Sequence, residues 1–267
     1  MTRTGRSLLL PAIALAAAVA AGTAAAGTAV VEDVKSPRGP TSRILVEKPA
    51  NAWVTLLVFT GGQGDLRISD GGEINNMRGN FLIRTSGDFV AAGAVTAIID
   101  APSDRSNLSN FRDTEGHAQD VGAVIRHLKA KFKLPVWVMG HSNGTTSAAN
   151  AVVRLTGDAR PDGAVVAASR FVSNAYGTSV LDLDLGKITG PMLIVHHKHD
   201  QCSGASADRV PDFRAALKNA VPAKALIYEE GYGIRSKACE SRHYHGFVGI
   251  ETRVVADIMA WIRNPAP

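Results

Sequence analysis

The stretch LPVWVMGHSNGTTSAA, residues 134–149, decides the expected fold of this chain. It consists of an apolar run, then a serine between two glycines, then a row of small residues. An ordinary glycine-rich turn would explain the glycines alone. A sharp corner between a strand and a helix explains the whole pattern, because a serine held in a strained backbone there needs small residues around it.

Apolar runs of the same kind recur along the chain and alternate with helical patterns. Strands are expected at 43–47, 53–60, 94–100, 135–140, 163–169, 191–197 and 224–230, and helices at 116–132, 143–156, 206–220 and 249–264. Several of the runs are apolar throughout, which is typical of strands buried on both faces. The alternation predicts an α/β fold, with a doubly wound, mostly parallel sheet flanked by helices. We expect one domain over residues 27–267, whose first part, up to about residue 40, is a loose lead-in.

The N-terminal residues 1–26 have the features of a secretory signal peptide. Arg3 and Arg6 give a positive start, an apolar core follows, and Ala24 and Ala26 fit the small residues that precede a cleavage site. The alternative is a membrane anchor, but the apolar segment is short against the roughly 20 residues that span a bilayer, and a proline interrupts it. The sequence therefore predicts a secreted or periplasmic protein without a membrane span once the signal is removed.

Charge and cysteine content narrow the class of protein further. The formal net charge is +5 and falls to +3 without the two arginines of the leader. No basic cluster or stripe accompanies this mild charge, so nucleic acid is not expected as a partner. Cys202 and Cys239 are the two cysteines of the chain, and in an exported protein they predict one disulfide.

Gly140-His141-Ser142-Asn143-Gly144 matches the G-x-S-x-G pattern of a nucleophile elbow, and it falls between an expected strand and an expected helix. A serine hydroxyl needs a base to become a nucleophile, and the base needs a carboxylate to orient it. On a sheet of this kind the partners follow in the order serine, acid, histidine. The sequence therefore predicts Ser142 as the nucleophile.

The acid and the base are expected in two later loops. Asp200 follows the apolar run 191–197 directly, whereas Asp182 and Asp184 precede it and are weaker candidates. Near the C-terminus, RHYHGF supplies His245 and His243. His245 is the expected base, because Gly246 would give it room to swing toward the serine, and His243 is the alternative.

An oxyanion formed at Ser142 would need backbone N–H donors. One is expected from Asn143, the residue after the nucleophile. The other is expected from the glycine-rich stretch VFTGGQGD, residues 58–65, with Gly62 favoured and Gln63 next. The alternative for this stretch is a plain glycine-rich turn.

These motifs together resemble the α/β-hydrolase fold family across nearly all of the expected mature chain. The stretches FTGGQG, GHSNG, HHKHD and HYHGF carry the resemblance, in the order of the family. The oxyanion loop of the family often begins with histidine, and Thr60 stands at that place here. The resemblance implies hydrolysis of a small acyl substrate, an ester above all, through a serine ester intermediate and without a metal or cofactor.

Many members of this family carry a helical lid between the strands that correspond here to 163–169 and 191–197. Only about twenty residues separate those strands in this chain, too few for a lid domain. An open site for short or protruding acyl groups is therefore expected.

Two other functions remain open from the sequence. His196, His197, His199, Asp200 and Cys202 could form the ligand set of a zinc hydrolase. Strand alternation, however, directs the first two histidines to opposite faces of the sheet. A non-catalytic binding protein on the same scaffold is the other alternative, because a fold by itself does not define an activity.

Overall fold

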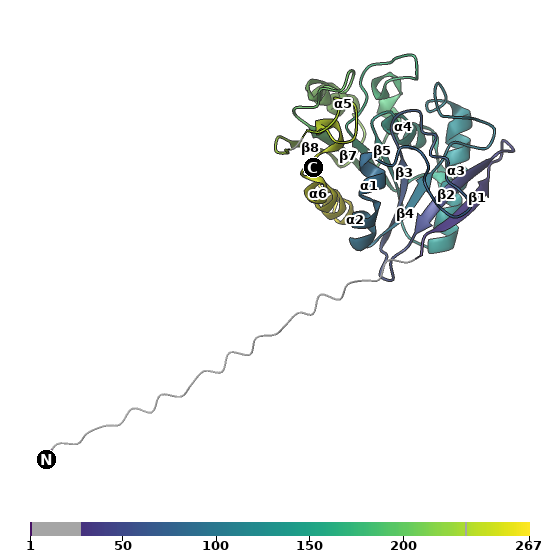
Figure 1. The fold of residues 1–267 in the computed structure, drawn as a ribbon, viewed down its shortest axis with the longest axis horizontal. Coiled ribbons are helices and arrows are strands. Elements are labelled where there is room, and N and C mark those ends of the chain that lie inside the picture. Colours follow the sequence, from purple (N-terminus) through teal and green to yellow (C-terminus); the bar gives the residue numbers. More distant parts are fainter. Residues whose placement is uncertain (2–27, 233) are drawn as a thin grey trace.

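Eight strands form one sheet at the centre of the molecule (Figure 1) in this computed structural model, which describes Met1 and residues 28–232 and 234–267. The strands are β1 (Val30–Lys35), β2 (Thr41–Glu47), β3 (Val54–Phe59), β4 (Ala94–Ile99), β5 (Val136–His141), β6 (Gly163–Ala167), β7 (Met192–His197) and β8 (Ala223–Tyr228). Their order across the sheet is β1-β2-β4-β3-β5-β6-β7-β8. The pairs β1–β2 and β2–β4 are antiparallel, and all other neighbouring pairs are parallel. The predicted mostly parallel α/β sheet is therefore confirmed.

Helices cover both faces of this sheet. The α-helices are α1 (Phe81–Arg84), α2 (Ser86–Ala91), α3 (Glu115–Phe132), α4 (Gly144–Arg154), α5 (Val210–Ala216) and α6 (Glu251–Arg263). Short 3₁₀ turns are η1 (Gly157–Ala159), η2 (Val180–Asp182), η3 (Leu185–Lys187), η4 (Ala207–Arg209) and η5 (Tyr244–Gly246). α3, α4 and α5 bury Val121, Ala148 and Phe213 against one face. α1, α2 and α6 bury residues such as Phe81 and Ile258 against the other.

The central strands show why the continuous apolar runs were informative. Every residue of β3, β4, β5, β6 and β7 is buried, as expected for strands covered by helices on both sides. The seven strands and four helices that the sequence predicted are all present, with ends that differ from the expected ones by a few residues. No lid domain interrupts the segment between β6 and β7, where the described elements are the 3₁₀ turns η2 and η3.

The expectation of a loose lead-in up to about residue 40 is wrong. Val30–Lys35 forms the edge strand β1 and pairs with β2 from Val30↔Val46 to Lys35↔Thr41. The strand was missed because its sequence, VVEDVK, is half charged, and only Val34 of the strand is fully buried. Backbone pairing with β2, rather than apolar burial, holds this segment in place.

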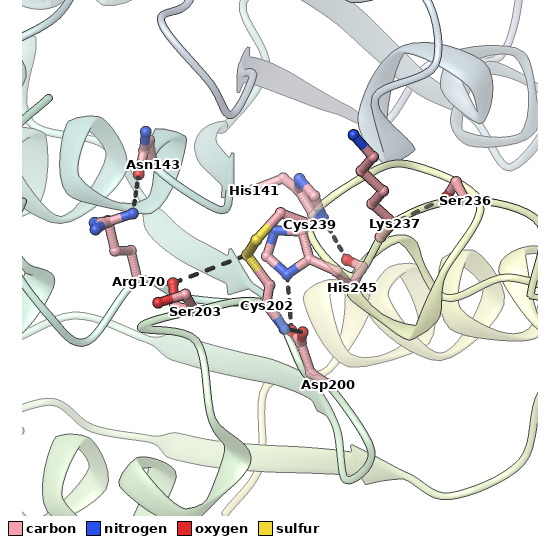
Figure 2. The surroundings of a disulfide bond; sticks show 10 residues. All are labelled: His141, Asn143, Arg170, Asp200, Cys202, Ser203, Ser236, Lys237, Cys239 and His245. Carbon is pink, nitrogen blue, oxygen red and sulfur yellow. Dashed lines mark hydrogen bonds and ion pairs between the residues drawn. A yellow bond between two sulfur atoms is a disulfide. The ribbon is translucent and has the colours of Figure 1, made fainter.

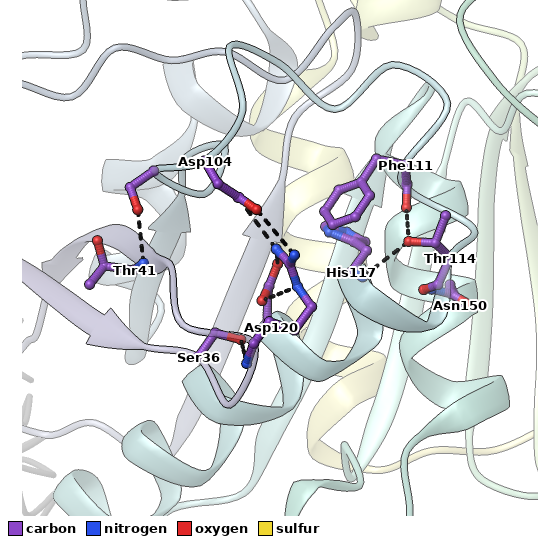
Figure 3. A network of polar contacts seen from close by, with 10 residues as sticks. Ser36, Thr41, Asp104, Phe111, Thr114, His117, Asp120 and Asn150 are labelled. Atoms are coloured by element: carbon purple, nitrogen blue, oxygen red, sulfur yellow. Dashed lines mark hydrogen bonds and ion pairs between the residues drawn. The ribbon is translucent and has the colours of Figure 1, made fainter.

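Arg38 lies just after β1 and connects this edge of the sheet to α3. Its guanidinium donates to both carboxylate oxygens of Asp120, at 3.0 and 2.7 Å, and contacts Asp104 at 3.1 Å. Figure 3 shows the carboxylates of Asp104 and Asp120 converging there. Because the Asp120 side chain is almost fully buried, loss of Arg38 would leave a carboxylate without its cation in the interior, which is costly.

The predicted leader, residues 1–26, lies outside the described residues apart from Met1. In the part of the chain that is described, no helix combines the length and the apolar character needed to cross a membrane.

His117 on α3 is buried between two aromatic rings, with ring centroids 6.1 Å from Phe59 and 5.4 Å from Phe111. Figure 3 shows His117 beside Phe111. Neither ring nitrogen has a hydrogen-bond partner among the described residues. Burial, with a smaller contribution from nearby arginines, lowers the pKa of His117 to about 3. The imidazole therefore stays neutral in the folded chain at any pH well above that value.

We predict that His117→Leu makes the protein less sensitive to acid. The unfolded chain takes up a proton at this histidine below its ordinary pKa of about 6.5, and the folded chain does not until about pH 3. The stability from His117 is therefore fully present above about pH 6.5 and is lost as the pH falls toward 3, at about 1.4 kcal/mol per pH unit. Between pH 6.5 and 4.5, urea unfolding should show the wild-type chain losing about 2–3 kcal/mol more than the variant. Equal losses in both proteins would contradict this assignment.

Candidate active site

The four loops that the sequence singled out all follow strands of the parallel part of the sheet. Ser142 follows β5, Asp200 follows β7, His245 lies beyond β8, and Gly62 lies just after β3. Parallel strands place their carboxyl ends at one edge, and the crevice at that edge is where α/β proteins bind ligands. Residues far apart in the sequence are brought together in this way.

Ser142 occupies the corner between β5 and α4 with a left-handed backbone, at φ 56°. A non-glycine residue in this region is unusual, and the surroundings over-determine it. Its N–H donates to the Ala167 carbonyl at 3.0 Å, and its own carbonyl accepts from the Thr145 N–H at 3.0 Å and the Thr145 hydroxyl at 2.6 Å. The corner predicted from the sequence is therefore present.

The two glycines of the motif are required by close backbone contacts. A Cβ at Gly140 would lie 2.3 Å from the Gly144 carbonyl oxygen, and one at Gly144 would lie 2.2 Å from the Phe59 carbonyl oxygen. A Cβ at Gly61 would lie 2.8 Å from the Cβ of Ser142. The end of β3, the serine corner and the start of α4 thus touch one another through backbone atoms.

Asp200 and His245 meet in a buried pair. His245 Nδ1 lies 2.8 Å from Asp200 Oδ2, and the two side chains are almost completely inaccessible to solvent. The other carboxylate oxygen, Oδ1, accepts from the Cys202 N–H at 2.9 Å. A carboxylate accepts only from a protonated nitrogen, so Nδ1 carries a proton, and in the neutral ring Nε2 is the nitrogen with the free lone pair.

His243, the alternative base, lies elsewhere. Its ring is buried, with Nδ1 unpartnered among the described residues, and packs edge-on against Tyr244 at 5.4 Å. Its carbonyl accepts from the N–H of Gly246 at 2.9 Å. The expected reason for Gly246 is also different in the structure. A Cβ there would lie 2.1 Å from the Ser241 carbonyl oxygen, so the glycine permits a tight turn rather than a swinging ring.

His141 fixes the backbone of the histidine loop. Asn80 Oδ1 accepts from the Leu82 N–H at 3.1 Å, which directs the Asn80 amide nitrogen toward His141 Nδ1 at 3.1 Å. Nδ1 of His141 is therefore an acceptor, and Nε2 donates to the carbonyl of His245 at 2.7 Å. Burial lowers the pKa of His141 well below its ordinary value, which keeps this ring neutral, as the arrangement requires. The sequence analysis did not assign any role to Asn80 or to the side chain of His141.

A disulfide joins Cys202 to Cys239 beside the Asp200–His245 pair, as predicted (Figure 2). Cys202 is also the residue whose N–H holds the Asp200 carboxylate. Cys239 belongs to the segment that forms a wall of the site. The disulfide thus connects the loop that carries Asp200 to a wall of the cavity.

Ser142 and His245 line the same cavity, of about 440 Å³. No hydrogen bond joins Ser142 Oγ to the His245 ring within the described residues, and such contacts are often loose when no substrate is bound. The full lining comprises Gly61, Gly62, Met77, Gly79, Asn80, His141, Ser142, Cys239, Glu240, Ser241 and His245. The walls formed by Met77, Gly79 and Asn80 and by residues 239–241 were not predicted, because nothing in their local sequence marks them.

The side chains that a zinc site would need do not lie together in the structure. His196 stacks on Phe171 at 5.6 Å, whereas His197 stacks on Tyr244 at 4.4 Å and its Nε2 contacts the Glu230 carbonyl. Cys202 is held in the disulfide rather than present as a thiolate. In the described part of the chain, no three histidine, cysteine, aspartate or glutamate side chains come together as a metal-binding group.

Solved structures resemble this chain in fold at low sequence identity. The Pyrococcus furiosus esterase Pf2001 aligns with a TM-score of 0.62 at 11% identity, covering 89% of this chain and 92% of that one. XC6422 from Xanthomonas campestris, described as an α/β serine hydrolase without lid, aligns at 0.55 and 16%, covering 90% and 96%. Carboxylesterase CesB from Bacillus subtilis aligns at 0.60 and 13%, covering 90% and 93%. The protein therefore has the α/β-hydrolase fold.

No protein-family model matches the chain, and no curated protein matches it in sequence. The relationship is thus visible in the arrangement of the backbone rather than in the sequence as a whole.

Gly144→Ala should destabilise the protein strongly. The added methyl would overlap the Phe59 backbone, and backbone atoms cannot move aside as a flexible side chain can. We expect the Tm to fall by about 5 °C or more, which corresponds to a loss of roughly 2 kcal/mol or more for a chain of this size. Gly87→Ala on α2 is the matched control, because a Cβ there meets nothing within 4 Å. Similar Tm values for the two variants would show that the close contact at Gly144 is not a constraint on folding.

Proposed function

We propose that the protein is a serine hydrolase that cleaves a carboxylic ester, or a related acyl bond, of a small molecule. Ser142 is the nucleophile, His245 the base and Asp200 the acid that orients it. The observation that carries the proposal is the buried 2.8 Å contact between His245 Nδ1 and Asp200 Oδ2, in a cavity that His245 shares with Ser142. A carboxylate behind an imidazole, beside a serine on a strained corner, is the arrangement that activates a hydroxyl.

In this mechanism His245 Nε2 takes the proton of Ser142 Oγ as the oxygen attacks the acyl carbon. The tetrahedral intermediate collapses when the imidazolium returns the proton to the leaving alcohol, and the acyl group stays on Ser142 as an ester. Water then attacks that ester with the same help from His245 and frees the acid. The Asp200 carboxylate holds the Nδ1–H tautomer and stabilises the imidazolium.

The N–H groups of Gly62 and Asn143 are our candidates for the oxyanion hole. Neither donates to another group of the described chain, so both are available to a substrate. The amide of Asn143 supports this geometry, since its Nδ2 donates to the Gly62 carbonyl at 3.0 Å and connects the two loops. Donors of this kind typically contribute several kcal/mol to lowering the barrier.

We also propose that the protein acts after export, outside the cytoplasm. The Cys202–Cys239 disulfide supports this, because such bonds persist in oxidising compartments and are rare in the cytosol.

Fluorophosphonate labelling of the purified mature chain tests the proposed chemistry. The wild-type protein should be labelled on Ser142 and should hydrolyse p-nitrophenyl esters, and Ser142→Ala should abolish labelling. His245→Gln should lower the rate of hydrolysis by about a thousandfold or more, because the serine then lacks its base. His243→Gln is the matched control and should retain most of the activity, since that ring does not contact Asp200.

Two outcomes would refute this assignment. A folded wild-type protein that is neither labelled nor active would favour the non-catalytic binding protein. Loss of activity with a chelator, but not with the phosphonate, would favour the metal-dependent alternative.

We predict a preference for short acyl chains. The cavity beside Ser142, of about 440 Å³, has no apolar lid over it, because the segment between β6 and β7 contains only 3₁₀ turns. A long chain would therefore remain largely in water and gain little binding energy. In a series of p-nitrophenyl esters, kcat/KM should be highest at two to four carbons and fall by about tenfold or more at twelve, which is roughly the selectivity that apolar pockets provide. A maximum at long chains would contradict the open site.

A further inference from the structure

Arg112 is a buried cation with an unusual set of partners. It is 5% exposed, and no carboxylate lies within ion-pair distance of it among the described residues. Its Nη1 donates to the Ser147 hydroxyl at 2.9 Å. Its Nη2 faces three consecutive carbonyl oxygens, of Thr60 at 3.0 Å and of Gly61 and Gly62 at 3.4 Å each.

Burying such a charge is costly, and chains normally place a carboxylate against it. Burial also lowers the pKa of Arg112, which shows that the surroundings resist the charge. Here the negative ends of three peptide dipoles take the place of the carboxylate. The loop that follows β3 and the guanidinium therefore depend on each other.

The direction of those carbonyls determines the direction of the N–H groups. In a trans peptide unit, the C=O of one residue and the N–H of the next point in opposite directions. Carbonyls of residues 60–62 that face Arg112 thus turn the N–H groups of residues 61–63 away from it. On the other side of this loop lies the serine, with Gly61 packed against Ser142 Cβ.

We propose that Arg112 is a positioning residue for the oxyanion hole. It holds the loop after β3 by its carbonyls, so that the N–H of Gly62 faces the space above Ser142 Oγ. Its charge, on the far side of the same peptide groups, also favours negative charge at the oxyanion position. Arg112 does not touch the substrate, and the inference rests on the proposed function.

The glycines of the loop fit this role. Gly64 has φ +73°, and a Cβ there would lie 2.4 Å from Arg112 Nη2, so this position leaves room for the guanidinium. The Gln63 carbonyl accepts from the Leu108 N–H at 2.7 Å, which connects the loop to the segment that carries Arg112. Together with the Asn143 amide on the Gly62 carbonyl, these contacts hold the loop from both sides.

Arg112→Met and Arg112→Lys test the proposal, with Ser147→Ala as the matched control. The methionine variant removes the guanidinium that donates to the loop carbonyls, and the lysine variant retains the charge with a single donor group. Ser147→Ala removes the acceptor of Nη1 but leaves the contacts of Nη2 with the loop. Thermal unfolding shows which variants are folded, and if the methionine variant does not fold, the lysine variant carries the test.

For ester hydrolysis we expect kcat to fall about 10- to 100-fold in the methionine variant and less in the lysine variant, with KM within about threefold. The Ki of an alkyl boronic acid, whose serine adduct is tetrahedral, should rise in proportion to the loss in kcat. A purely structural role would lower the Tm without this selective loss. Ser147→Ala should leave kcat and the Ki of the boronic acid close to their wild-type values.

Amide hydrogen exchange of residues 60–64 gives a readout that does not depend on activity. Exchange there should be faster in both Arg112 variants than in the wild type and the Ser147→Ala control. Unchanged exchange, or an active enzyme whose kcat is unaffected by the substitutions, would overturn the positioning role. If the wild-type chain is inactive while residues 60–64 still exchange faster in the Arg112 variants than in the wild type, the proposed hydrolase is refuted and with it any oxyanion role for the loop.

Discussion

The corner at Ser142 is the contact on which the site depends. Gly140, Gly144 and the Phe59 carbonyl approach so closely that no side chain larger than hydrogen fits at either glycine. The positive φ of Ser142 follows from this crowding, because the chain must leave β5 and enter α4 within a few residues. The strain is balanced by hydrogen bonds from β6 and from the first turn of the helix. A packed sheet thus holds one hydroxyl at its edge in a conformation that an isolated peptide would rarely adopt.

The topology of the sheet brings the other residues of the site close to Ser142. Because β3, β5, β7 and β8 run parallel within one sheet, the loops at their carboxyl ends meet although up to 184 residues, from Gly61 to His245, separate them in the chain. Long loops of this kind are loose unless something ties them. His141 holds the His245 carbonyl, Arg84 contacts the Gly246 carbonyl, and the disulfide joins the acid loop to the wall of the cavity. These contacts hold the backbone of the histidine loop and the acid loop, and the Asp200 carboxylate then orients the imidazole itself.

The sequence predicted those features that local patterns encode. The continuous apolar runs identified the five central strands, and the small residues around Ser142 identified the corner. β1 was missed because its stabilisation comes from backbone pairing, which leaves no apolar signature in VVEDVK. The walls of the cavity and the partners of Arg112 could not be predicted, because they depend on which distant segments face each other after folding. His245 was chosen over His243 on the evidence of Gly246, yet this glycine serves the turn with Ser241 instead.

Burial also determines which histidines can act in acid–base chemistry. Burial lowers the pKa values of His117, His141 and His196, and none of these rings has a carboxylate within hydrogen-bond distance in the described chain. Their protonated forms would be charges in a region of low dielectric constant without a hydrogen-bonded carboxylate to balance them. At His245 the same burial is accompanied by the Asp200 carboxylate, so a proton taken up by Nε2 would create an ion pair rather than an isolated cation. This difference among the buried imidazoles, more than the mere presence of a histidine near the serine, supports the role of base that we propose for His245.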